Sequence, residues 1–419
     1  MGRRRGSKRR TAAGGGGGDR LTALPLELRA QIASCLPFKQ AVQLSALSRP
    51  WRRIHHHTPV VRISLRELVS VVDAGDGRHS LLVLDVDSAV ATHAVLARRL
   101  RDVSASRVEA LALACYADNA RTRYHADRII AAADARDIRI DAPSLYPLDQ
   151  EHEEPWTLDL PAGARSLEVD LYRGLAPAIA DSAPGAAALR SLSLDNVELR
   201  GWPPLLPSLR SLSLRCAAVR VKAPFAPAAW CPALEDLDIS SSTIEHGRVD
   251  IRLPRLRYLD MDDVDVVGPP GVVAVDAPEM VELDVYCSAG CTADLRSFSL
   301  RAPRLRVLRW ENQYAERVHM DAAAVEVGVI RFTERVDVDA GRPARVVSTY
   351  TRQMKCYREQ MTRMLQGLLP NLPPERIADV SKPCMELEVH LHHEVDEYTG
   401  EMTKEEKLTC DLKALKALL

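Results

Sequence analysis

A short apolar motif recurs through the middle of the chain and constrains the fold more than any other feature. Its first, fourth and sixth positions are leucine or another apolar residue, and the copies begin at Leu189, Leu209, Leu234, Leu256, Met280 and Leu305. Successive copies start 20, 25, 22, 24 and 25 residues apart, and weaker copies occur at Val108 and around Leu167. One copy cannot bury its own apolar face, so we expect the copies to stack as short strands around a shared core.

Prolines recur in the same phase as this motif. One stands two residues before each of five copies, at Pro207, Pro232, Pro254, Pro278 and Pro303. Proline lacks a backbone donor and is confined to the margins of strands. The pattern therefore predicts that the chain enters each strand through the same kind of bend.

The repeat resembles a leucine-rich repeat, whose period is ~20 to 29 residues. The resemblance implies a solenoid of parallel strands. The family's ladder of asparagines is missing, so we expect an irregular solenoid; its positions hold Val197, Ala217, Ser242, Val264, Ser288 and Gln313. The convex-side segments are short and rich in proline, which argues against a helix in every repeat. An ordinary β-sandwich of alternating strands is the alternative.

Residues 19–58 form a separate block that is predicted to be helical. Pro25 suits the first turn of a helix, and Leu24, Leu28, Ile32 and Leu36 follow at four-residue steps. Pro37 ends this helix, a second short helix carries apolar residues almost all round, and a third is expected to start at Ser48. About forty residues rarely build a self-sufficient core, so some of these side chains need a surface on the rest of the chain or on a partner.

This block resembles the F-box motif. The resemblance lies in the run Leu-Pro-x-Glu-Leu, then Ile, then Leu-Pro, then Ala-Val-x-x-Ser-x-Leu-Ser-Arg-x-Trp-Arg. In that family three helices dock on the Skp linker subunit of a cullin-RING (SCF) ubiquitin ligase. The resemblance assigns this contact to Leu24, Pro25, Leu28, Ile32, Leu36, Pro37, Val42, Leu47 and Trp51. Pro50 departs from the family, which usually has Arg or Lys there, and is expected to bend the start of the third helix.

The two ends of the chain differ in character from the repeats. Residues 1–18 hold six basic residues and a glycine run, which predict a disordered tail. The tail is a nuclear localisation signal, a nucleic-acid contact or a solvated segment that no specific partner binds. Residues 346–419 are expected to form an α+β cap. Its predicted parts are an amphipathic helix over Thr349–Leu369, a strand within MELEVHLHHEV and a further helix over Lys404–Leu419.

The sequence therefore predicts an α/β chain in four parts. They are a disordered tail at 1–18, a three-helix F-box at 19–58, an irregular leucine-rich-repeat solenoid with parallel strands and Pro-rich convex loops at 59–345, and a capping region at 346–419.

Composition and motifs point away from catalysis. Net charge is −1, the nine cysteines are scattered without a Cys-x-x-Cys pair, and no apolar run is long enough to span a bilayer. No Walker loop, dinucleotide fingerprint, Gly-x-Ser-x-Gly elbow or His-Glu-x-x-His occurs. The histidines at 55–57 and the pair His390 and His392 are better explained as a polar turn and a polar strand face than as metal ligands. We expect no enzyme activity, metal or cofactor.

The residues between the buried leucines are predicted to line the concave face of the solenoid. In three neighbouring repeats they are largely acidic, and the predicted substrate-binding residues are Asp236, Asp238, Tyr258, Asp260, Asp262, Glu282, Asp284 and Tyr286. Clustered carboxylates attract a counter-charged partner, so a protein with a basic segment is the expected substrate; acidity that serves only solubility is the alternative.

Taken with both resemblances, these features predict a substrate-recognition subunit of an SCF-type ubiquitin ligase in the cytoplasm, the nucleus or both. Its partners would be a Skp-type linker, through it a cullin, and an unidentified protein substrate, with no membrane and no nucleic acid expected. The alternative is a leucine-rich-repeat interaction scaffold that acts outside a ubiquitin ligase.

Overall fold

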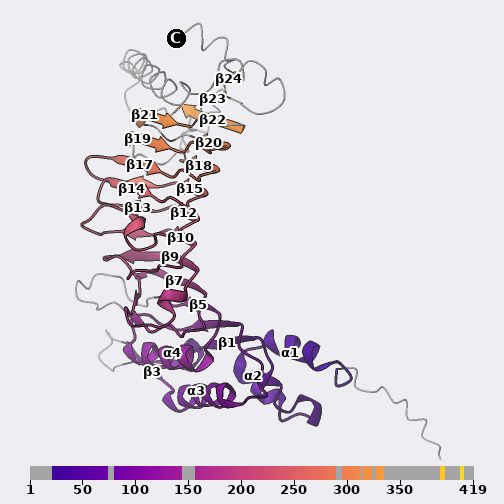
Figure 1. Ribbon diagram of the computed structural model, residues 1–419. Helices are drawn as coiled ribbons and strands as arrows, with labels where there is room; N and C mark the ends of the chain where they lie inside the picture. The colour runs from indigo at the N-terminus through magenta and orange to yellow at the C-terminus, as the bar shows by residue number, and fades with distance from the viewer. Residues whose placement is uncertain are drawn as a thin grey trace, which may run out of the picture.

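The computed structural model shows a column of stacked strands with helices at its N-terminal end (Figure 1). It describes residues 21–73, 80–143, 156–288, 295–311, 313, 315–322, 327–334, 387–391 and 406–409. The predicted tail at 1–18 and the predicted helix over 349–369 lie outside these residues. Within the described residues, no helix is long and apolar enough to cross a membrane.

A parallel β-solenoid of about seven turns occupies residues 110–311. Its long sheet follows the order β1-β4-β5-β7-β9-β10-β12-β15-β18-β20, and each of these strands is parallel to its neighbour. The strands are β1 (Val60–Ser64), β4 (Ala110–Ala114), β5 (Asp137–Asp141), β7 (Ser166–Leu175), β9 (Ser191–Leu199), β10 (Ser211–Arg215), β12 (Asp236–Ser240), β15 (Tyr258–Asp262), β18 (Glu282–Tyr286) and β20 (Val307–Glu311). Parallel pairing from β1 to β20 excludes the β-sandwich of alternating strands.

The six copies from Leu189 to Leu305 form β9, β10, β12, β15, β18 and β20, as predicted, whereas the motif did not mark β1 and β5. Its first positions, from Leu189 to Leu305, are completely buried, and the fourth and sixth positions also face one continuous core. The register keeps equivalent residues side by side, as in the row Leu212, Leu237 and Leu259. Stacking therefore buries the apolar face that a single copy exposes.

Each of the five prolines occupies the same turn before a strand. In this turn the backbone N–H of the motif's first residue donates to the carbonyl three residues earlier, as from Leu256 to Leu253 and from Leu305 to Ala302. The proline is the second residue of the turn, where its fixed φ is favourable. The predicted common bend is confirmed.

A second bend follows several of the strands. Asn196, Cys216, Ser241 and Asp263 each come just after the aligned part of a strand and have φ between 48° and 53°. The chain then forms a short ladder from the end of β9 through β11 (Ala218–Val219), β13 (Thr243–Ile244) and β16 (Asp265–Val266). Left-handed backbone is unfavourable for residues with a Cβ, so the stacked neighbours must hold it in place.

The positions of the missing asparagine ladder lie inside this corner. Val197, Ala217, Ser242, Val264 and Gln313 are all buried. Ser242 Oγ accepts a hydrogen bond from the Ala217 N–H at 3.0 Å and donates to the Ser240 carbonyl at 2.8 Å. Burial of these positions, with two polar residues among apolar ones, fits the expected irregularity.

The opposite wall of the solenoid differs from the expected proline-rich loops. Towards the C-terminus it is a second parallel sheet of β14 (Arg248–Arg252), β17 (Val272–Asp276), β19 (Leu295–Arg301) and β21 (Ala315–Asp321). Shorter elements lie before it: β6 (Thr157–Leu158), β8 (Ala178–Ile179), η4 (Ala186–Ala188) and η5 (Pro227–Ala229). Successive turns of the solenoid are one strand spacing apart on this wall as well. Segments with alternating apolar residues therefore pair there as parallel strands.

Helices replace this wall in the first turns. They are α3 (Val86–Arg101) and α4 (Ala120–Ala133), which pack together at the N-terminal end of the column (Figure 1), and α4 contacts β4. Asp85 accepts a hydrogen bond from the Ser88 N–H, and Asn119 accepts from the N–H groups of Arg121 and Thr122, so both helices have a side-chain N-cap. An antiparallel hairpin of β2 (Val69–Asp73) and β3 (Ser80–Leu84) precedes α3 and follows η3 (Arg66–Leu68).

The N-terminal block contains two α-helices, not three. They are α1 (Leu26–Ser34) and α2 (Phe38–Leu44), and the predicted third helix is only the 3₁₀ turn η1 (Arg49–Trp51), followed by η2 (Ile54–His56). Ser48 makes no side-chain capping bond, Pro50 lies within η1, and Arg53 has a φ of 63°. Arg52 directly after the turn is not helical, and the left-handed Arg53 follows it, so the turn does not continue as an α-helix.

The C-terminal strands extend the long sheet. β22 (Val327–Glu334) pairs with β20, and β23 (Leu387–Leu391), within the predicted capping strand, pairs with β22 in parallel. β24 (Glu406–Thr409) then pairs with β23 in the antiparallel direction. The helix predicted from Lys404 is therefore wrong over Glu406–Thr409, because pairing to an open strand edge outweighs local helix propensity.

Candidate protein-binding surfaces

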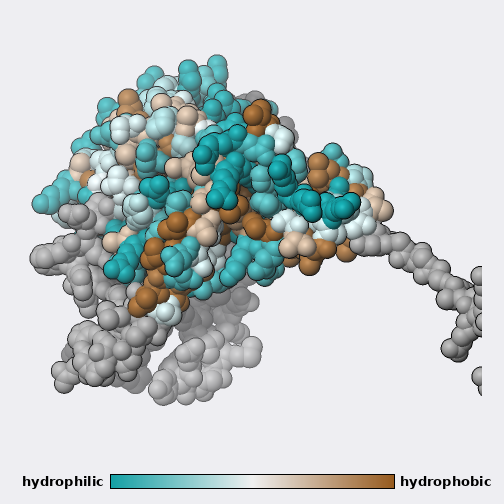
Figure 2. Space-filling view, turned by 90° about the horizontal axis from the view of Figure 1, so that it is seen from below, coloured by the Kyte–Doolittle hydropathy of each residue, from teal (hydrophilic) through white to brown (hydrophobic). Residues whose placement is uncertain are grey.

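Large apolar side chains are exposed on the N-terminal block. We call this set the α1 patch: Leu21 is 55% exposed, Leu26 38%, Leu28 45%, Ile32 40% and Leu47 74%. Leu28 and Ile32 are four residues apart on α1 and thus share one helix face. Figure 2 shows apolar side chains on this block at the right of the view. An apolar patch on a projecting block is typical of a protein-binding surface.

The block has a very small core of its own. It consists of Ala30, Ala33, Ala41, Trp51 and Ile54, with Leu44 packed against it. Three of these five residues are alanines, so the block buries little apolar area and cannot also cover the leucines of the α1 patch.

The predicted docking residues therefore divide into three groups. Leu28 and Ile32, with Pro25 and Leu47, are exposed, whereas Leu24, Leu36 and Pro37 are half-buried. Trp51 is buried in the small core, and half-buried Val42 packs against the solenoid core. The four-residue spacing missed Leu21 and Leu26, which extend the exposed set. The high density of leucines between Leu21 and Leu28 was the signal that could have revealed them.

A buried arginine joins this block to the solenoid. Arg99, on α3, is 2% exposed, and its guanidinium donates to the carbonyl oxygens of His55, Thr58 and Ser106 at 2.6–2.9 Å and to Thr58 Oγ1 at 2.8 Å. Burial lowers its pKa to about 10, so it stays charged at neutral pH. His56 Nδ1 lies 2.9 Å from Asp102 Oδ2 and ties the same segment to the end of α3. The junction holds the α1 patch at a defined place on the solenoid.

The outward face of the long sheet carries the predicted acidic residues in register. We call Asp236, Asp238, Asp260, Asp262, Glu282 and Asp284 the acidic face. Asp238 lies beside Asp260, which in turn lies beside Asp284. Neighbouring strands are ~4.8 Å apart, so these carboxylates form a continuous row across three turns.

Cations neutralise the two margins of the acidic face and leave its centre less compensated. Arg309 on β20 bonds Glu282 at 2.6 Å and Asp284 at 2.9 Å. At the other margin, Ser213 Oγ donates to Asp238 at 2.8 Å, and Arg215 lies 3.4 Å from the same carboxylate. Between these margins lie Asp260 and Asp262.

The pKa values of the acidic face reflect this charge distribution. Partial burial, then the neighbouring carboxylates of Asp284, Asp238 and Asp262, raise the pKa of Asp260 to about 6. Burial and the adjacent Asp263 also raise the pKa of Asp262. Like charges placed side by side favour a proton or a cation between them.

Two tyrosines border the acidic face. Tyr258 is 42% exposed and Tyr286 38% exposed, and each lies on the same strands as the carboxylates. A tyrosine ring offers apolar area and one hydroxyl group at low entropic cost, which suits protein contacts. The structure therefore brings together all eight residues predicted for this face.

No metal centre is evident among the described residues. Over that part of the chain, no group of three or more His, Cys, Asp or Glu side chains is arranged to hold an ion. His55 is buried against Phe38 and His56, and burial lowers its pKa to about 4. It therefore packs as a neutral ring in the junction, while the side chain of His390 and all of His392 lie outside what the structure describes.

Comparison of the chain with protein-family models, curated proteins and solved structures found no match.

Proposed function

We propose that this chain is the substrate-recognition subunit of an SCF-type ubiquitin ligase. In this proposal the N-terminal block is an F-box that docks on a Skp-type linker subunit, and through it on a cullin. The solenoid is a leucine-rich repeat whose sheet face binds the substrate protein. The chain itself needs no catalytic residue, because a receptor contributes by holding a substrate near the charged ubiquitin carrier.

The observation that carries the proposal is the α1 patch. Five large apolar side chains are 38–74% exposed on a block whose own core has five residues. Exposed leucines on a fixed helix favour association with an apolar partner, since removing each from water contributes ~1–2 kcal/mol. The patch includes Leu28 and Ile32, which the F-box resemblance assigns to the linker contact.

The acidic face supports the second half of the proposal. It presents a row of carboxylates and two exposed tyrosines on the side of the long sheet that faces away from the solenoid core. Such a surface suits a basic, extended segment of a substrate protein.

Charged substitutions on α1 test the linker contact directly. Leu28→Asp combined with Ile32→Asp should abolish co-purification with a Skp-type subunit, because both carboxylates would be buried in the interface. Both side chains are already exposed, so circular dichroism and the thermal midpoint should stay near those of the unsubstituted chain.

A matched control keeps this test specific. Val83 and Val103 are 43% and 103% exposed outside the α1 patch, and changing both to Asp should leave the association intact. Retained binding by the Leu28 and Ile32 variant would contradict the proposed docking face. Failure of the unsubstituted chain to co-purify with a Skp-type subunit would favour an interaction scaffold outside a ubiquitin ligase.

A further inference from the structure

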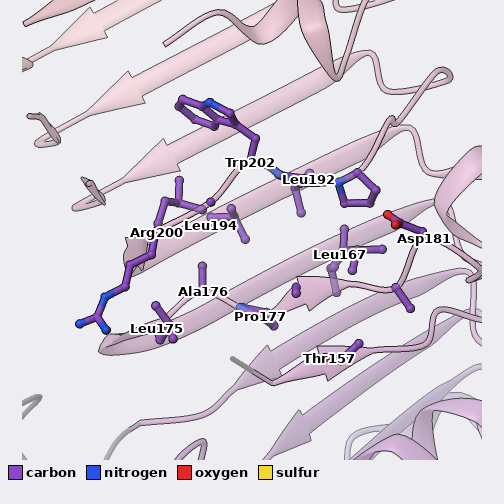
Figure 3. A pocket seen from close by; sticks show the side chains of 17 residues that line it. Thr157, Leu167, Leu175, Ala176, Pro177, Asp181, Leu192, Leu194, Arg200 and Trp202 are labelled. Carbon is purple, nitrogen blue, oxygen red and sulfur yellow. The ribbon is translucent and has the colours of Figure 1, made fainter. Parts of the chain in front are cut away.

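A cavity of about 620 Å³ lies inside the solenoid at the turns formed by β7 and β9. It is bounded on one side by the long sheet and on the other by the segments that contain Pro177 and Trp202 (Figure 3). It is thus separate from the α1 patch and from the outward acidic face. Its volume is within the ~300–1,000 Å³ that small-molecule sites occupy.

The two walls of the cavity differ in the size of their side chains. The sheet contributes Leu167, Leu192 and Leu194, which are the core-facing positions of the repeat. The opposite wall contributes Ala176, Ala178 and Ala180, from an alanine-rich stretch before the next turn. In Figure 3 the short side chain of Ala176 lies below that of Leu194.

Other turns of the solenoid fill the corresponding space with aromatic rings. Phe225 and Trp230 are buried in the turns after β10, and Phe298 packs edge to face on Trp310 at 4.8 Å further along the column. The turn height is the same throughout, so replacing such rings by alanines leaves a hollow with apolar walls.

An aromatic surface borders the hollow. Trp202 lines it and stacks on Trp230, with ring centroids 6.1 Å apart. Trp202 also packs edge to face against Phe225 at 5.5 Å. Two further aromatic rings therefore back the Trp202 ring, which makes it a supported platform beside the leucine wall.

Two charged side chains line the cavity, and Arg200 and Asp181 lie at its opposite ends in Figure 3. Arg200 Nε lies 2.6 Å from Oε1 of the buried Glu198, which also lies 3.4 Å from Arg220, so the charge of Arg200 is partly compensated within the chain. Asp181 is exposed to water. A ligand held here needs no net charge, and its apolar part would meet leucine, alanine and tryptophan.

We propose that this cavity binds a neutral, mainly apolar small molecule with a compact ring system. The leucine wall removes its apolar surface from water, and Trp202 stacks beside it. This inference does not depend on the proposed ligase role, because it uses neither the α1 patch nor the acidic face.

The fluorescence of N-phenyl-1-naphthylamine, a neutral apolar probe, tests this on the full chain. The unsubstituted chain should bind the probe saturably at one site. Ala176→Leu should fill the hollow and weaken binding at least tenfold, with a thermal midpoint equal to or above that of the unsubstituted chain. Trp202→Ala should also weaken binding, and energy transfer from tryptophan to the bound probe should fall.

Two controls locate the probe. Ala187→Leu adds the same side chain at an exposed position close by and should leave binding unchanged. The Leu28→Asp and Ile32→Asp variant should also bind normally. Binding that survives Ala176→Leu, binding that this α1 variant removes, or failure of the unsubstituted chain to bind saturably would each overturn the proposal.

Discussion

At the scale of single residues, the acidic face places carboxylates that repel one another side by side. Asp260 lies in register between Asp238 and Asp284, and Arg309, the nearest compensating cation on the sheet, is engaged by Glu282 and Asp284. The raised pKa of Asp260, about 6, follows from partial burial and these neighbours. An isolated aspartate on a soluble surface would have no reason to titrate there.

We expect this carboxyl to make the chain more stable in mild acid. The folded-state pKa of Asp260 lies above the usual aspartate value, so the folded chain binds a proton between pH 6 and 4 that the unfolded chain does not. Stability should therefore rise as the pH falls through that window, by under ~1 kcal/mol because the side chain is partly solvated. Asp260→Asn should flatten the dependence, as urea unfolding at several pH values will measure; an identical slope would contradict it.

At the scale of elements, the junction between the helical block and the solenoid depends on one buried cation. Arg99, on α3, donates to the backbone carbonyl groups of His55, Thr58 and Ser106, and the Ser106 N–H donates to the His56 carbonyl at 3.0 Å. The block has a small core of its own, and Phe38 and Val42 on α2 pack against the solenoid core. Its position therefore rests on these apolar contacts together with the polar contacts to α3.

Removing that cation should loosen the junction. Arg99→Met keeps the aliphatic stem but leaves buried carbonyl groups without a donor, so we expect a loss of about 2–3 kcal/mol in urea unfolding. Limited proteolysis should cut the variant faster between η2 and β1. Arg98→Met, an exposed neighbour on the same helix, is the matched control, and equal stability of the two variants would show that the junction does not depend on Arg99.

At the scale of the whole molecule, the two candidate surfaces belong to different parts of the chain. The α1 patch lies on the block beside the first turns, whereas the acidic face spans β12, β15 and β18 farther along the column (Figure 1). The acidic strands lie at least six strand positions from β1, or ~30 Å at the spacing of a sheet. A linker protein and a substrate can thus be held at once without competing for one surface.

The acidic face should select basic partners. Asp260→Lys combined with Asp262→Lys should weaken binding of a lysine-rich peptide at least fivefold and reduce the salt dependence of binding. The same charge change at Glu316 and Asp321, on β21 of the other sheet, should have little effect. Fluorescence anisotropy at two salt concentrations measures both, and unchanged affinity in the first variant would remove charge attraction as the basis of recognition.

The sequence by itself determined the periodic part of this protein. Leucines at fixed spacing, with a proline two residues earlier, can be buried only by stacking, and they predicted the strands, their turns and the in-register acidic face. The sequence also predicted the two helices before residue 45, because apolar periodicity and prolines are local signals.

Only the tertiary structure decided what depends on contacts between distant segments. Trp51 was predicted as part of a docking surface and is buried instead, because Ala30, Ala33 and Ala41 leave room for its ring. The segment at Glu406–Thr409 became a strand because β23 offered an open edge. The hollow beside Trp202 exists because small side chains of one segment face the leucines of another. Local patterns set which faces are apolar, but packing between distant segments decides which are covered, which stay exposed and where space remains.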